Sequence, residues 1–382
     1  MKNISIGVLI FLSAFITSCT KEKAKTVIAL TKIAEKKFKI DTLTSIKTWC
    51  MDIYERDSSV FLVYENKNKP SIQFYNLNES KLSFEINLNM IGPNGVGVTD
   101  GFYVKTLDSI YLINTTDMRV YQINRKAEVQ RVFSFLKSSE SFPYGSMSTP
   151  KIITGSPAIY YKDRLQLCAL PGLGPTNKET FESGKVNIAL NISTGGFDLN
   201  FGYPDTYKTR KFGNFWGKIF RSKTHDGRIM YSFGADPNVQ ITDYTTTTDH
   251  YAGSSYFEDP TPYKDALQMR TNDVTSTMYG GIFYDKYRKQ YYRIVTGGIE
   301  YAPSGLKGSE AYDIKPLSVI ILNLDFEKVG ETLLPTKAHD PLGVFVGPEG
   351  LYMSNSNLYN KNLQENILSF SIYAPIKTKT PE

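Results

Sequence analysis

The chain has 382 residues, of which 41% are hydrophobic and 13% aromatic, and its formal net charge is +6. A chain of this length can bury a large core, either as two ordinary domains or as one large β architecture. Its 44 basic residues are scattered among 38 acidic ones, and this absence of a basic patch excludes nucleic acid as a partner.

The N-terminus has the pattern of a signal peptide. Lys2 supplies the positive charge, and an apolar stretch from Ile4 to Ile16 is followed by Thr-Ser-Cys, which ends at Cys19. The stretch is shorter than the roughly 20 residues that a permanent transmembrane helix needs. We therefore assign residues 1–18 to a cleaved signal peptide.

Residues 16–19 resemble the lipobox of bacterial lipoproteins, with Ile16 where leucine is commoner. The resemblance implies that Cys19 carries acyl chains such as palmitate. An ordinary secretory signal that ends in Ser-Cys is the alternative. Because each buried methylene contributes about 0.8 kcal/mol, several chains hold a protein firmly on a membrane. We expect an outer-membrane anchor, on the periplasmic side or the cell surface, followed by a tether over residues 19–32.

Beyond the tether, a repeated pattern of short strands dominates the chain. Three apolar runs each end in an asparagine, namely Ile72–Asn76, Val120–Asn124 and Val319–Asn323, and each is followed by another apolar run. Asparagine fits a tight polar turn at these points. The first two runs also share their flanking hairpins at an offset of about 50 residues, which is the repeat length of a β-propeller blade.

The strand pattern predicts an all-β fold, a β-propeller of six blades over residues 33–376, with a C-terminal tail at 377–382. We place the blades at residues 46–88, 100–136, 152–201, 213–257, 277–334 and 342–374. The last set lacks a strand, which an N-terminal strand near Lys36–Ile40 would supply, closing the ring and removing the exposed edges of an open sheet. A seventh blade in the middle third and a pair of β-sandwich domains stay open. No helix is predicted after the leader.

The lipobox, the glycine-rich loop Ile91–Gly97, the strand Asp108–Leu112 and the turn at Asn124 together resemble a family of uncharacterised six-bladed propeller lipoproteins of Bacteroides-type Gram-negative bacteria. The resemblance extends over most of the mature chain and is most specific at residues 46–136 and 315–352. It implies the fold and the location, and no activity.

Two cysteines remain after Cys19, each within an apolar run. We interpret Cys50 and Cys168 as buried free thiols. An oxidising compartment would also allow a disulfide between them, and this alternative stays open.

No catalytic constellation stands out in the sequence. His250 and His339 each lie beside an aspartate, but the three histidines of the chain have no metal-ligand spacing. Propellers that hydrolyse lactones or esters often hold calcium near the central channel, and the residues that could lie there are Asn94, Asn214, Asp273 and Asn355. We favour a non-enzymatic binding or scaffold lipoprotein. The alternative is a calcium-dependent hydrolase or lyase that acts on glycans or lactones at the channel mouth.

Residues 203–265 are longer than a blade requires and rich in aromatics. Long loops on a rigid scaffold are common binding surfaces, and aromatic rings can stack on sugars or anchor a protein partner. We therefore predict a glycan or protein ligand on one propeller face, contacted by residues among Trp216, Tyr244, His250, Tyr251 and Tyr256.

Overall fold

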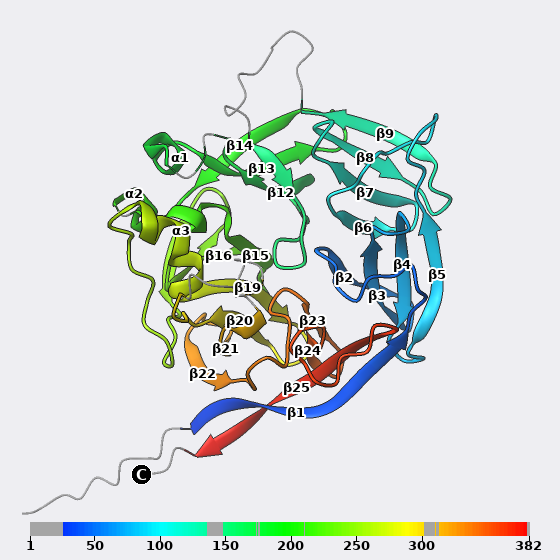
Figure 1. Ribbon diagram of the computed structural model, residues 1–382. Helices are drawn as coiled ribbons and strands as arrows, with labels where there is room; N and C mark the ends of the chain where they lie inside the picture. The colour runs from blue at the N-terminus through cyan, green and yellow to red at the C-terminus, as the bar shows by residue number, and fades with distance from the viewer. Residues whose placement is uncertain are drawn as a thin grey trace, which may run out of the picture.

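The computed structural model describes residues 26–135, 148–172, 174, 176–209, 211–301, 310 and 313–379. These residues form six antiparallel sheets arranged around a central axis (Figure 1). The protein is therefore a six-bladed β-propeller, as predicted. The expected signal peptide and Cys19 lie outside the described residues, and no helix within them is long and apolar enough to cross a membrane.

The first three blades follow in chain order. Blade one contains β2 (Met51–Arg56), β3 (Ser59–Asn66), β4 (Ser71–Asn76) and β5 (Lys81–Asn87). Blade two contains β6 (Phe102–Thr106), β7 (Ser109–Asn114), β8 (Arg119–Ile123) and β9 (Val129–Ser134). Blade three contains β10 (Thr149–Lys151), β11 (Ile159–Tyr161), β12 (Arg164–Leu170), β13 (Lys185–Asn191) and β14 (Phe197–Gly202), with β10 and β11 both paired to β12.

The second half of the ring has the same organisation. Blade four contains β15 (Ile219–Lys223), β16 (Ile229–Phe233), β17 (Asn238–Thr242) and β18 (Thr247–Tyr251). Blade five contains β19 (Met278–Asp285), β20 (Gln290–Thr296), β21 (Leu317–Leu322) and β22 (Lys328–Leu333). Blade six contains β23 (Val344–Gly347), β24 (Gly350–Ser354), β25 (Ile367–Lys379) and, as its outermost strand, β1 (Thr26–Lys39).

The middle strands of each blade are buried on both sides, because neighbouring blades pack face to face. Every residue of β4, β16 and β21 is buried, whereas most residues of the outer strand β5 are at least partly exposed. The repeated asparagines occupy the predicted turns: the side-chain oxygen of Asn76 accepts the amides of Asn78 and Glu79, and that of Asn124 accepts the amide of Lys126. The repeat in the sequence is thus the turn between the third and fourth strands of a blade.

Strand β1 closes the ring, but it is longer than predicted. It begins at Thr26 and pairs with β25 along its whole length, from Thr26 opposite Lys379 to Lys39 opposite Ile367. Residues 26–32, which we assigned to the tether, are therefore strand, and so are residues 377–379 of the expected tail. The strand extends because its first half also contacts blade five, where the Leu30 amide donates to Thr332 Oγ1 at 2.7 Å.

The prediction that the mature chain lacks helices is wrong. The structure has α1 (Lys178–Glu182), α2 (Asp205–Thr209), the 3₁₀ helix η1 (Gly213–Gly217) and α3 (Ala266–Thr275). Figure 1 shows α1, α2 and α3 beside blades three to five. Helix α3 begins where the Asp265 side chain accepts the Gln268 amide at 2.9 Å, an N-cap that satisfies a free helical donor. Cys50 and Cys168 are both buried free thiols, as predicted.

Candidate functional site

The connections between strands divide the ring into two unequal faces. Strand direction alternates within each blade, so successive connections lie on opposite faces. On one face they are tight turns, such as residues 57–58, 107–108, 243–246 and 348–349. On the other they are long, such as residues 40–50, 88–101, 252–277, 334–343 and 355–366. We call these the short-connection face and the long-connection face. Binding surfaces are usually built from long loops on a rigid scaffold, so the long-connection face is the candidate functional face.

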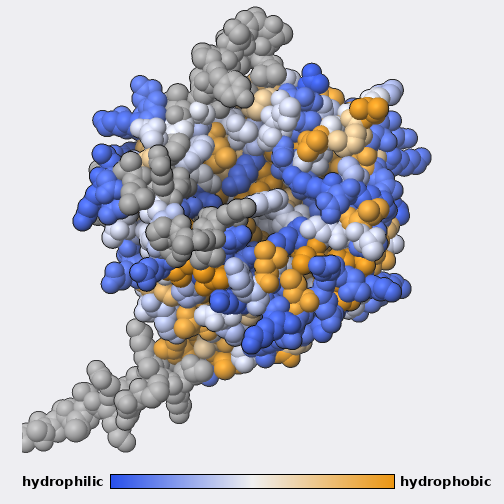
Figure 2. Space-filling view, in the orientation of Figure 1, coloured by the Kyte–Doolittle hydropathy of each residue, from blue (hydrophilic) through white to orange (hydrophobic). Residues whose placement is uncertain are grey.

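A cavity of about 560 Å³ lies at the mouth of the central channel on the long-connection face. Ligand pockets commonly have volumes of about 300–1,000 Å³ and mostly apolar walls. Here the apolar lining consists of Trp49, Phe220, Met278, Pro341, Leu342 and Leu358. Figure 2 shows hydrophobic residues (orange) beside the hollow at the centre of the visible face. We call this cavity the mouth cavity.

Two hydrophobic side chains of the mouth cavity are unusually exposed. Trp49 is 61% exposed and Leu358 is 59% exposed. Trp49 lies two residues before the inner strand of blade one, and Leu358 lies in the connection between β24 and β25. Large apolar side chains held open to solvent beside a cavity are typical of sites that bind a ligand.

Charged groups of both signs surround the apolar lining. They are Lys47, Lys218, Asp273, Glu310, Asp313 and Asp340. Lys47 pairs with the buried Asp313, with Nζ and Oδ1 3.1 Å apart. Burial raises the pKa of Asp340 above its usual range, and its carboxylate accepts the Leu342 amide at 3.0 Å. The mouth cavity therefore offers an apolar surface with a few fixed polar groups, which suits an amphipathic ligand.

Lys315 fixes helix α3 beside the mouth cavity. Its buried Nζ donates to the carbonyl oxygens of Asp273 and Ser276, at 2.8 Å each. These carbonyls belong to the C-terminal end of α3, where backbone acceptors lack helical partners. Burial lowers the pKa of Lys315 to about 7. We assign this lysine a structural role, since both contacts hold the helix in place.

Residues 154–157 cross the channel below the mouth cavity, and we call this segment the strap. The Thr154 amide donates to the Trp49 carbonyl of blade one at 2.9 Å, and the Arg221 amide of blade four donates to the Gly155 carbonyl at 2.9 Å. Gly155 also faces Gly281 of blade five, and a Cβ on Gly155 would lie 2.8 Å from Phe220 Cδ1. Only glycine fits this crossing, and the strap contacts two residues of the mouth-cavity lining, Trp49 and Phe220.

The structure does not bring the five predicted aromatic site residues together. Trp216 and Tyr244 are half-buried and pack against one core cluster, and Tyr244 lies in a turn of the short-connection face. The His250 ring packs on Phe326, with centroids 5.1 Å apart. Tyr251 and Tyr256 are 62% and 52% exposed, and Tyr256 lines a separate cavity of about 310 Å³. Their role in binding stays a prediction.

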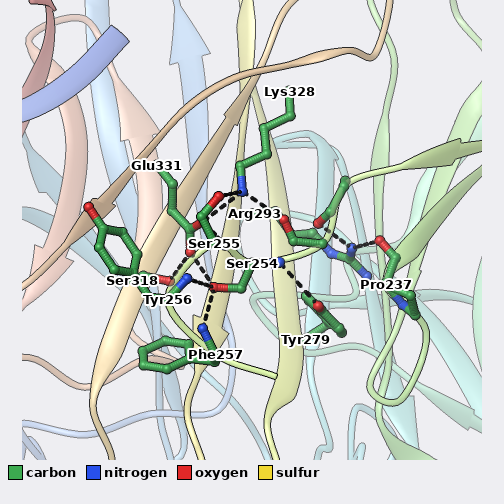
Figure 3. A network of polar contacts seen from close by, with 12 residues as sticks. Pro237, Ser254, Ser255, Tyr256, Phe257, Tyr279, Arg293, Ser318, Lys328 and Glu331 are labelled. Carbon is green, nitrogen blue, oxygen red and sulfur yellow. Dashed lines mark hydrogen bonds and ion pairs between the residues drawn. The ribbon is translucent and has the colours of Figure 1, made fainter. Parts of the chain in front are cut away.

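A buried polar network fixes the loop that carries Tyr256 (Figure 3). Glu331 accepts hydrogen bonds from the Ser254 and Ser318 hydroxyls and the Ser255 amide, each at 2.6 Å. Lys328 Nζ lies 2.7 Å from Glu331 and also donates to the Gly253 carbonyl. The loop is therefore tied to blade five, which presents Tyr256 on a rigid support.

Of the four residues that we predicted for calcium, Asn94, Asp273 and Asn355 do not gather at the channel. Asn94 accepts the Val129 amide of blade two at 3.0 Å, Asn355 bonds Ser369 and Ser371 of blade six, and Asp273 lines the mouth cavity. Asn214 belongs to η1. Within the described ranges no three His, Cys, Asp or Glu side chains lie close enough to hold a metal ion.

Sequence reasoning missed the mouth cavity. Its lining residues Trp49, Phe220, Met278 and Leu342 lie at or just before the starts of the inner strands β2, β15, β19 and β23. Once the blades are placed, these positions converge on the axis by topology alone. The signal was therefore present in the strand starts and not in a catalytic motif or a long aromatic loop.

Comparisons with known proteins identify the family and support the fold. A family model described as a domain of unknown function, DUF4221, matches residues 28–333. A crystal structure of a DUF4221 member from Bacteroides vulgatus is 24% identical, with a TM-score of 0.82, over 92% of this chain and 99% of that chain. A "putative exported protein" from Bacteroides fragilis is 10% identical, with a TM-score of 0.53, over 92% and 96% of the two chains. No curated protein matches the sequence.

Proposed function

Since the chain belongs to the DUF4221 family, for which no activity is defined, we propose from its own geometry that it is a lipid-anchored binding protein whose ligand enters the mouth cavity. The observation that carries this proposal is the apolar cavity of about 560 Å³ on the channel axis, with Trp49 and Leu358 exposed at its edge. We infer an amphipathic ligand that places an apolar group between these side chains and a polar group near Lys47 and Asp313.

The direction of β1 supports a specific orientation on the membrane. β1 begins, and β25 ends, at the short-connection side of blade six. Residues 20–25 between the predicted lipid on Cys19 and the start of β1 span at most about 20 Å when fully extended. In this arrangement the long-connection face is directed away from the bilayer, so the mouth cavity is open to ligands in the aqueous phase.

The two tryptophans of the chain provide a direct test of binding at the mouth. In the Trp216→Phe variant all tryptophan fluorescence comes from Trp49, at the edge of the mouth cavity. In the matched Trp49→Phe variant it comes from the half-buried Trp216 alone. We expect compounds from an amphipathic fragment library to change Trp49 emission and leave Trp216 emission unchanged. The variant Leu342→Trp in the Trp216→Phe background, which narrows the cavity with a larger ring, should weaken binding of the same compounds at least tenfold, as measured by calorimetry. Compounds that bind Leu342→Trp unchanged would place the site elsewhere.

A further inference from the structure

A second cavity, of about 320 Å³, lies on the other side of the strap, toward the short-connection face. The strap residues Thr154 and Pro157 line it, together with the inner strands of blades one, four, five and six. Most of the wall is apolar or aromatic, including Ile53, Phe283 and Phe345. We call it the inner cavity, because it lies on the channel axis, farther from the long-connection face than the mouth cavity.

One carboxylate in the inner cavity has no cationic partner in the described part of the chain. Asp52 lies on the inner strand β2, and its Oδ1 accepts only the amide of the next residue, Ile53, at 2.7 Å. Burial raises the pKa of this carboxyl to about 6. An ionised carboxylate in an apolar cavity is costly unless a cation compensates it, so at neutral pH Asp52 is a countercharge that lacks its partner.

The other charged groups around the inner cavity are already engaged. Glu55 accepts from both Lys286 Nζ and the Tyr287 hydroxyl, contacts that connect blade one to blade five across the channel. The Arg221 guanidinium donates to Asn187 and to the Gln166 carbonyl in blade three, at 2.8 and 2.7 Å. Lys286 and Arg221 therefore do not neutralise Asp52. The contacts of Glu55 with Lys286 and Tyr287 lie at the opening of the cavity.

From this juxtaposition we propose that the inner cavity binds a small organic cation, with its ammonium group against the Asp52 carboxylate and its carbon atoms against the apolar and aromatic wall. Aromatic faces attract cations through their ring quadrupoles, and quaternary ammonium groups are recognised in this way. Phe283, Tyr284 and Phe345 supply such rings. An anion would meet an uncompensated carboxylate, and a neutral apolar molecule would leave that carboxylate without a partner. The proposal is independent of the mouth cavity.

Binding should depend on pH through Asp52 alone. The groups that face it are Cys50 just before β2, Glu55 on β2, Tyr103 on β6, Arg221 on β15, and Tyr284, Lys286 and Tyr287 on blade five. Burial raises the pKa of Cys50 well above its usual range and that of Tyr103 to about 12, and the Lys286 and Tyr287 contacts lower that of Glu55. Between pH 5 and 8 the charge beside a bound cation therefore changes through the protonation of Asp52.

The test is calorimetric titration of the mature, non-lipidated protein with choline and with its uncharged isostere 3,3-dimethylbutan-1-ol. Choline should bind at pH 8 and should bind roughly tenfold more weakly at pH 5, where a carboxyl with a pKa near 6 is mostly protonated. Asp52→Asn should lose at least tenfold in choline affinity at pH 8. The matched control Asp57→Asn, in the exposed turn after β2, should bind choline like the wild type, because Asn tolerates the positive φ of 54° found there.

Three results would overturn the proposal. They are the absence of choline binding at millimolar concentration, equal binding by Asp52→Asn and the wild type, and equal affinity for choline and its uncharged isostere. If Asp52→Asn does not fold, the pH dependence of the wild type decides the question by itself.

Discussion

Removing the Phe38 ring from β1 tests whether this strand locks the ring of blades. Phe38 is completely buried. Its ring makes edge contacts with Tyr75 of blade one, at a centroid distance of 5.4 Å, and with Phe370 of β25, at 6.3 Å. The side chain therefore connects blade six to blade one, which is the seam that closes the propeller.

The structure sets the size of the expected effect. Replacing a buried phenylalanine by alanine costs about 3–5 kcal/mol, because apolar burial is lost and a cavity is left. With an unfolding entropy of about 2.1 cal/mol/K per residue, a folded chain of roughly 350 residues should melt about 4–7 °C lower. The matched control is Ile33→Ala on the same strand. Ile33 is 52% exposed, at the bulge between Lys32 and Ala34, and its loss should shift Tm by less than about 1 °C.

Differential scanning calorimetry of the two variants gives the comparison. A Phe38→Ala variant that melts within 1 °C of the wild type would refute the closure argument. Equal losses for Phe38→Ala and Ile33→Ala would refute it too, because the burial difference between the two positions would then have no energetic effect.

Three further predictions concern the anchor, the loop network and the channel carboxylate. Cys19→Ser should leave the protein unprocessed or soluble in cell fractionation; normal processing with full membrane retention would contradict lipidation. Glu331→Ala should lower the free energy of unfolding by about 3 kcal/mol, because it leaves four donors without their acceptor. It should also speed amide hydrogen exchange at Ser254–Phe257. The control is Glu327→Ala at the exposed neighbouring position, and equal exchange rates in both variants would contradict the role of the network. Because the folded state holds the Asp52 proton more tightly than the unfolded chain, the contribution of Asp52 to stability should fall as pH rises from about 4 to about 6. Asp52→Asn should therefore be more stable than the wild type at pH 7.5, by up to roughly 3 kcal/mol, and the two proteins should be nearly equal in stability at pH 4. Urea unfolding at both pH values measures this difference. A variant less stable than the wild type at pH 7.5 would show that the carboxylate stabilises the fold.

The blades could be predicted because their signal is local. A propeller repeats a unit whose turns and buried strands lie within about 50 residues, and the Asn76 and Asn124 turns mark that unit directly in the sequence. The extent of β1 could not be read in the same way. Its partner lies at the far end of the chain, and the first half, Thr26–Lys32, has no period-2 alternation, although its apolar run Val27–Leu30 was an available signal.

Helix α3 was missed because its composition argues against a helix. Thr271, Asn272, Asp273, Val274 and Thr275 are all weak helix formers. The available signal was the cap: Asp265 is followed three residues later by Gln268, whose side chain accepts the Lys264 amide at 2.8 Å, much as in a capping box. Tertiary contacts then hold the helix, since Asn272 donates to the Phe212 carbonyl and Lys315 binds its C-terminal end.

The candidate sites could be predicted only in part, since cavities depend on convergence in space. The aromatic-rich segment 203–265 does place Tyr251 and Tyr256 at the surface, yet most of its other rings pack between blades, as in the cluster of Tyr203, Tyr207 and Phe233. Trp49 and Asp52 are separated by only two residues in the sequence, but they line different cavities. No linear pattern reports such a division.

A crystallographic fragment screen of the mature protein tests the central claim most directly. Crystals soaked with a few hundred amphipathic fragments should show density for bound fragments concentrated in the mouth cavity, between Trp49, Leu342 and Leu358. Leu342→Trp crystals soaked with the same fragments should show none there. Fragments that bind elsewhere on the propeller and leave the mouth cavity empty would contradict the proposal that this cavity is the ligand site.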